Sequence, residues 1–228
     1  MNEASANQAG LDGQQAEFPV RLVVEKPQLF ERAQLLLRIP VMILLSALHQ
    51  PFGGTTSALY FILPVVAAVL ISQHGKDEFL TNDSKWMRSA LEWVIGLFAY
   101  LMLVTDRVPL GPNQRQVCLE VRPGGTPSVP TALIRFLTTL PHLLALAVLC
   151  MVSVLIWFYA AFSVLLTENY PSTLQRFQQA VLSWMARVFA YHCSLVEEYP
   201  PFAIDSESAS RPLATCELEI TDHDNDAT

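Results

Sequence analysis

The hydrophobic residues of this chain are gathered in long runs that are separated by short polar stretches. The longest run covers residues 131–167, where Arg135 is the one charged residue. A run of this length exceeds the 18 or so apolar residues that indicate a transmembrane helix, and it lacks the polar face of a soluble core helix. We therefore predict a mainly α-helical, multi-pass membrane protein.

Other, shorter segments have the hydrophobic periodicity of strands or of amphipathic helices. VRLVVE (20–25) and VCLEVR (117–122) alternate as half-exposed strands do, and LATCELEI (213–220) would add a third short strand to a small sheet that faces water. Residues 86–104 and 174–189 have the period of amphipathic helices. In the second of these, the apolar residues share one face and Gln175, Arg176, Gln178, Gln179, Ser183 and Arg187 fall largely on the other.

The chain also contains an internal repeat. LEWVIGLFAYLMLVTDRVP (91–109) aligns without a gap with LSWMARVFAYHCSLVEEYP (182–200). Each of these segments comes after a strand pattern and a Pro-interrupted apolar stretch, so the unit as a whole recurs. The predicted organisation is a disordered tail (1–17), repeat 1 (18–110), a linker (111–116), repeat 2 (117–204) and an acidic tail (205–228).

The number of membrane spans is open at this point. Charged residues avoid the breaks at 50–57 and 150–153, so two hairpins formed by 33–49 with 57–73 and by 132–149 with 150–167 would give four spans. No turn residues mark 150–153, however, and one long helix from Pro141 to Thr167 is the competing interpretation. We prefer four spans and accept up to six, with helix breaks at Pro40, Pro141 and His142.

The distribution of charge bears on which classes of partner are expected. The formal net charge is −7, but the acidic residues are concentrated in 1–17 and 205–228, and the part between these tails is slightly basic. Such a distribution is usual for membrane-flanking loops, and no basic patch suggests nucleic acid. Of the four cysteines, Cys118 and Cys216 lie on expected strands and could approach each other, although a cytoplasmic location would keep them reduced.

A few side chains are candidates for specific roles. Glu92 and Arg187 lie inside the last helix of their units and would form an intramembrane ion pair if these helices pack together. Expected anchors at the membrane boundary are Trp86, Trp93, Trp157, Trp184, Tyr100, Tyr191, Arg38 and Arg135. The histidines show no ligand spacing, so we predict no metal, no cofactor and no catalytic residues.

Four segments form a further pattern, namely Pro19-Val20-Arg21-Leu22, the Pro141-His142 step, Thr167 with Tyr170-Pro171, and Glu198 to Phe202. These segments resemble a bacterial membrane-protein family, domain of unknown function 4389. Repeat 2 matches the pattern more closely than repeat 1, where Val41 replaces the histidine. The resemblance implies a location in the bacterial inner membrane and carries no activity.

Three functions compete on this basis. The preferred one is a non-enzymatic accessory or scaffold protein that packs against a larger membrane complex and also binds lipid. The alternative is a small transporter or channel with its path at the repeat interface, and the third is a membrane enzyme that acts on lipid. Expected partners are membrane lipids and a membrane protein or further copies of this chain, with both tails cytoplasmic.

Overall fold

The structure is a computed structural model that describes residues 18–25, 27, 30–52, 55–106, 108 and 116–204, without the side chains of 44–52 and 55–59. Its elements follow a repeated order. One strand is followed by several helices, and a second strand is then again followed by helices. The elements are β1 (Val20–Val24), α2 (Arg32–Phe52), α3 (Thr55–Glu78), the π-helical turn η1 (Phe79–Asp83), α4 (Ser84–Leu101), β2 (Val117–Val121), α5 (Val129–Thr138), α6 (Leu140–Thr167) and α7 (Ser172–His192).

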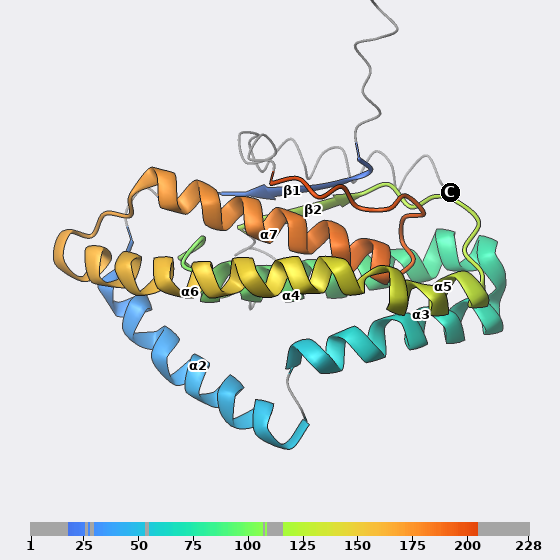
Figure 1. The fold of residues 1–228 in the computed structure, drawn as a ribbon, viewed down its shortest axis with the longest axis horizontal. Coiled ribbons are helices and arrows are strands. Elements are labelled where there is room, and N and C mark those ends of the chain that lie inside the picture. The colour runs from blue at the N-terminus through green and yellow to red at the C-terminus, as the bar shows by residue number, and fades with distance from the viewer. Residues whose placement is uncertain are drawn as a thin grey trace, which may run out of the picture.

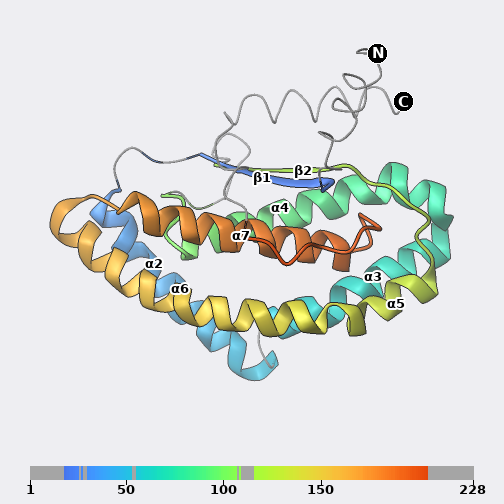
Figure 2. The same cartoon turned by 45° about the horizontal axis from the view of Figure 1, so that its top comes forward.

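The elements form layers (Figure 1). The two strands lie on one side of the molecule, α4 and α7 lie directly beneath them, and α3, α5 and α6 form the next layer. The tilted view in Figure 2 shows the same order, with α6 and the strands on opposite sides of α7. Helix α2 extends away from this body below α6. The main core therefore lies around α4 and α7, between the sheet and the outer helices.

The sheet confirms both predicted strands in this region. β1 and β2 are antiparallel, and Leu22 pairs with Leu119 at the centre of the register. Both of these side chains are buried, because one face of the sheet packs on α7 and α4. The alternating pattern thus located both strands, although Val23 and Cys118 on the other face are buried as well.

Helix α5 begins at a capping box and ends just before α6. The Ser128 hydroxyl accepts a hydrogen bond from Thr131 N, the Thr131 hydroxyl accepts one from Ser128 N, and Pro130 occupies the first turn. Thr139 separates α5 from α6, and Pro141 then lies in the first turn of α6. The break predicted at Pro141 and His142 thus comes just before them, whereas α2 continues through Pro40, where a break was expected.

The multi-pass prediction is wrong. Among the described residues, α6 alone is long and apolar enough to cross a membrane. The four-span interpretation required a turn near residues 150–153, but α6 runs through them as a single helix of 28 residues. These positions contain no glycine or proline to end a helix, so the competing interpretation of one long helix is the correct one.

Most of the polar residues of α7 lie inside the protein. Gln175, Gln178, Gln179, Ser183 and Arg187 are all buried. The reason is position, because α7 lies between the sheet, α4 and α6 and is buried from Gln178 to His192, whereas Arg176 near its start is exposed. Periodicity showed two different faces along this helix, but it could not show that a neighbouring helix covers the polar one.

Several predictions fall outside the described residues. These are the tails 1–17 and 205–228, the strand 213–220 and, apart from Gln116, the linker 111–116. Within the described part, Cys118 is disulfide-bonded and Cys150 and Cys193 are free thiols. Cys216, the predicted neighbour of Cys118, lies in the part that is not described.

Candidate functional site

A buried arginine ties α2 to the chain that leaves α4. The Arg38 guanidinium lies over the Tyr100 ring, 4.5 Å from its centroid, and Nη2 donates to the Thr105 carbonyl at 2.5 Å. The Asp106 carboxylate is 3.6 Å from the same nitrogen. Asp106 also accepts a hydrogen bond from Glu31 N at 3.1 Å, directly before α2 begins. We call Arg38, Tyr100, Thr105 and Asp106 the first clasp.

A second arginine makes a similar set of contacts between α5 and the chain that leaves α7. The Arg135 guanidinium lies 4.4 Å from the Tyr191 ring centroid, and Nη1 donates to the carbonyls of Tyr191 and of Val196, the latter at 2.7 Å. Glu197 accepts a hydrogen bond from Thr126 N at 3.0 Å, shortly before α5. We call Arg135, Tyr191, Val196 and Glu197 the second clasp.

The helices that end at the two clasps finish in the same way. Leu103 and Ser194 both have a φ of 61°, the left-handed conformation that ends many helices. In each case the amide two residues after the helix bonds back to the tyrosine carbonyl, at 3.2 Å for Leu103 and 3.0 Å for Ser194. These turns direct Thr105 and Val196 toward the arginines, so the helix end positions the carbonyl that each guanidinium binds.

Burial makes the clasps important for stability. The side chains of Arg38 and Arg135 are both almost fully buried. Burial lowers the pKa of each guanidinium, while Tyr100 and Asp106 act against this on Arg38, and Tyr191 and Glu197 do so on Arg135. Because arginine keeps its charge in proteins, each clasp has to supply the hydrogen bonds that water would otherwise provide.

A second cluster forms where the chain after α7 crosses the start of α6. We call residues 198–204 the strap. Phe202 stacks on the His142 ring with centroids 4.0 Å apart, and Trp184 Nε1 donates to His142 Nδ1 at 3.3 Å. Arg187 Nη2 donates to the Ala203 carbonyl at 2.6 Å, and the Tyr199 hydroxyl donates to the Thr138 carbonyl at 3.1 Å.

The strap brings together motifs that are far apart in the sequence. The Pro141-His142 step and the Glu198 to Phe202 segment both belong to the family pattern, and here they are in direct contact. His142 is fully buried beneath the aromatic rings, so it does not face solution. In this structure, these motif residues therefore pack the strap onto α6 and α7.

His192 forms a further link, between α7 and α3. Its ring stacks on Tyr60 at 4.8 Å, and Nε2 donates to the Tyr60 carbonyl at 2.7 Å. Burial lowers the pKa of His192, and its hydrogen bond to the Tyr60 carbonyl acts in the opposite direction. Burial dominates, so the imidazole is neutral at pH 7 and serves as a hydrogen-bonding core residue.

The polar residues of α7 also meet α6. Gln178 Nε2 donates to the Ser153 carbonyl at 2.9 Å, across the interface between the two helices. The Ser153 hydroxyl, Gln175 Nε2 and Gln178 Oε1 have no hydrogen-bond partner among the described protein atoms. Buried polar atoms of this kind are usually paired with ordered water. The α6–α7 interface is therefore partly polar, unlike the outer surface of α6.

The two members of the predicted ion pair lie on helices that pack against each other. Glu92 is half-buried on α4, and Arg187 is buried on α7, where it binds the Ala203 carbonyl. The direct Glu92–Arg187 contact stays a prediction. Among the described residues, no group of three or more metal-ligating side chains comes together.

The expected anchors divide into two groups. Trp86 and Trp93 are exposed, whereas Trp157 is half-buried on α6. The remaining anchors are interior residues, namely Trp184, Tyr100, Tyr191, Arg38 and Arg135. The two arginines do not reach headgroups from these positions, and sequence reasoning missed their stacking on the tyrosines. The signal that could have found it is that each half has an arginine at a comparable distance before its tyrosine, 62 residues from Arg38 to Tyr100 and 56 from Arg135 to Tyr191.

Comparison with known proteins gives one match. Residues 130–203 match the model of a family described as "Domain of unknown function (DUF4389)". The matched part contains α5 apart from its first residue, α6, α7, most of the strap and all four residues of the second clasp. No curated protein and no solved structure matches the chain.

The second clasp predicts a large stability effect. Replacing Arg135 with alanine leaves the Tyr191 and Val196 carbonyls without their charged donor, and we expect the free energy of unfolding to fall by about 3 kcal/mol. Arg135→Lys should recover less than half of this, because an ammonium group cannot stack and bind both carbonyls. Urea titration in mild detergent measures the effect. Exposed Arg122→Ala is the control, and an equal result for both alanine variants would contradict the role of the clasp.

The strap predicts a change in the reactivity of His142. In the unaltered protein His142 is covered, so diethyl pyrocarbonate should leave it unmodified. Phe202→Ala removes the stacked ring, with a cost of about 1 kcal/mol, and should make His142 reactive. Peptide mass spectrometry identifies the modified histidine. Phe158→Ala, an exposed position on α6, is the matched control and should leave His142 protected. Equal modification in both variants would argue against the strap as a cover.

Proposed function

We propose that this protein is a non-enzymatic scaffold that is anchored in a membrane by its outer helices and presents its sheet side to a protein partner. The observation that carries the proposal is the exposure of α6. Only 17% of its most apolar 18-residue stretch is buried inside the molecule. A helix of a soluble core would be mostly buried, whereas α6 leaves a long apolar surface uncovered that water does not favour.

The other outer helices extend this surface. Exposed apolar side chains occur on α2, α3 and α5 as well, and we call this surface, together with that of α6, the apolar layer. Its members on these three helices include Leu36, Ile43, Phe61, Ile62, Ile134 and Leu137. Scattered exposed leucines are normal in soluble proteins, but many large exposed apolar side chains gathered on four helices are typical of contact with lipid. The bacterial inner membrane is the compartment that the family resemblance implies.

The side opposite the apolar layer supports the scaffold role. Among the described residues the sheet consists of β1 and β2, and it lies on the side of α4 and α7 away from the apolar layer, where a protein partner can reach it without competing with lipid. The acidic segment 205–228 follows the strap and would suit recruitment of a basic partner. Together these features favour an accessory subunit that binds lipid on one side and protein on the other.

We also propose that the chain is built from two copies of one unit. The element order recurs, and so do the arginine–tyrosine stack, the carbonyl that accepts from the arginine and the left-handed residue after the helix. Tyr100 and Tyr191, like Leu103 and Ser194, are equivalent in the ungapped alignment of the sequence. A duplication would explain why two distant parts of the chain share these details.

Anchoring by α6 is tested by placing a charge on its exposed surface. Leu155 is 71% exposed, and Leu155→Arg should weaken binding to vesicles of phosphatidylethanolamine and phosphatidylglycerol by about 2 kcal/mol, roughly 30-fold. Vesicle flotation measures the bound fraction. Thr126→Arg, an exposed position in the loop after β2, adds the same charge and should bind normally. A protein that does not float with vesicles at all would refute membrane anchoring.

The scaffold role is tested by purification from the native membrane. The tagged protein is extracted in mild detergent, and its companions are identified by mass spectrometry. We expect a membrane protein at stoichiometric level, and the tagged Leu155→Arg variant should lose it together with the membrane. A homogeneous protein that retains a lipid or solute but no protein partner would contradict the scaffold and favour the transporter alternative.

A further inference from the structure

We propose that α6 lies in the plane of one membrane leaflet and does not cross the bilayer. The inference rests on the proposed membrane anchoring and specifies its geometry. The partner surface is then a single lipid leaflet, which the apolar layer enters from one side. Both ends of α6 stay near the same membrane surface, and the sheet stays in water.

The surface of α6 fits this arrangement. Its buried residues form one narrow stripe, which consists of His142, Leu146, Ser153, Ala160 and Val164. Exposed apolar residues follow each other along the full length of the other side, from Leu144 near the start to Leu166 near the end. A helix with one apolar side in contact with lipid and the other on protein can lie flat in the interface.

The neighbours of α6 argue against a crossing. A turn of four residues joins α6 to α7, so the two helices form an antiparallel hairpin along which they pack. The strands lie alongside α7 on the side away from α6 (Figures 1 and 2). If α6 crossed the membrane, the middle of α7 and the sheet beside it would come to the depth of the hydrocarbon. Arg21 and Glu120 of the strands would then lie at that depth, where charged side chains are costly.

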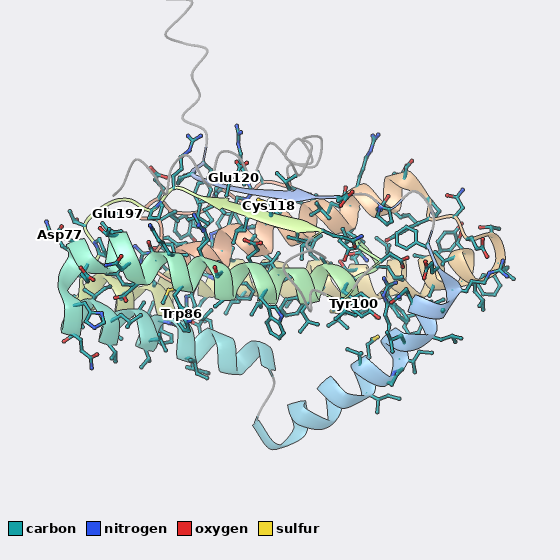
Figure 3. The ribbon with its side chains drawn as sticks, turned by 180° about the vertical axis from the view of Figure 1, so that it is seen from behind. Asp77, Trp86, Tyr100, Cys118, Glu120 and Glu197 are labelled. Carbon is teal, nitrogen blue, oxygen red and sulfur yellow. The ribbon has the colours of Figure 1, made fainter. Side chains whose placement is uncertain are left out.

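Helix α4 gives an independent marker of depth. Trp86 and Trp93 are 64% and 51% exposed and lie seven residues apart, which places them on the same face of α4. Figure 3 shows Trp86 on the side of α4 toward α3, and Glu120 on the sheet at the opposite side. Tryptophan favours the boundary between headgroups and hydrocarbon. A boundary at the level of these rings leaves the sheet in water and the apolar layer in lipid.

Lipid fits the apolar layer better than a protein partner does. Residues 39–75 and 136–167, which contain much of α2, α3 and α6, include no Asp, Glu, Lys or Arg. Protein interfaces usually combine an apolar centre with a polar rim. Around Arg38, moreover, α2 exposes apolar residues on several sides, among them Leu36, Leu37, Ile39 and Ile43. A protein partner would cover one side of such a helix, whereas lipid chains surround it.

The test measures membrane depth along α6. Single cysteines at Leu144, Met151, Leu155, Phe162 and Leu166 carry a spin label in the full chain with Cys150→Ala, bound to phosphatidylethanolamine and phosphatidylglycerol vesicles. Power saturation with oxygen and with a water-soluble nickel chelate then gives the depth of each label. Thr126→Cys, in the loop after β2, is the control and should stay in water.

The in-plane arrangement predicts a similar depth for all five labels, about 5–10 Å below the headgroups. A profile in which Met151 and Leu155 lie about 15 Å deeper than Leu144 and Leu166, with these ends at opposite surfaces, would overturn the inference and leave the anchoring intact. Access of the nickel chelate to all five labels would instead overturn the membrane anchoring itself. The two failures are thus distinguishable in one series.

Discussion

The burial of α7 from Gln178 to His192 is the constraint on which the rest of this structure depends. A helix with glutamines and an arginine can occupy a core only if its neighbours provide hydrogen bonds or exclude water around them. Here the sheet and α4 cover its apolar side, while the Ser153 carbonyl of α6 and the Ala203 carbonyl of the strap receive its polar groups. The polar contacts between α7 and α6 are therefore made on the inner side of α6, and the apolar side of α6 faces outward.

The clasps serve the same arrangement from the ends of the helices. Arg38 holds α2 to the end of α4, and Arg135 holds α5 to the end of α7. A charged guanidinium inside the protein requires fixed acceptors, and the left-handed turns at Leu103 and Ser194 supply them. Long apolar helices have little directional contact of their own, so these polar clasps specify where the outer helices sit on the central pair.

The sequence allowed some of this to be predicted. Alternation gave both strands, but the long apolar run was preferred as two spans, and α6 as one helix was only the competing interpretation. The number of membrane-crossing segments was wrong, because composition cannot tell a helix that crosses a bilayer from one that packs along a buried neighbour. The same limit applied to Arg38 and Arg135, since an arginine beside an apolar run has the same sequence pattern whether it reaches headgroups or a tyrosine ring. The strap was visible only as a motif, because contact between His142 and Phe202 depends on the folded path of the chain.

The central claim is that the apolar layer enters lipid while the sheet stays outside. Neutron reflectometry of the full chain on a supported bilayer with deuterated lipid tails tests it most directly, since it gives the protein density across the membrane without altering a residue. We expect protein density in one leaflet and in the water layer next to it. Density through both leaflets, or none within the lipid, would contradict the account.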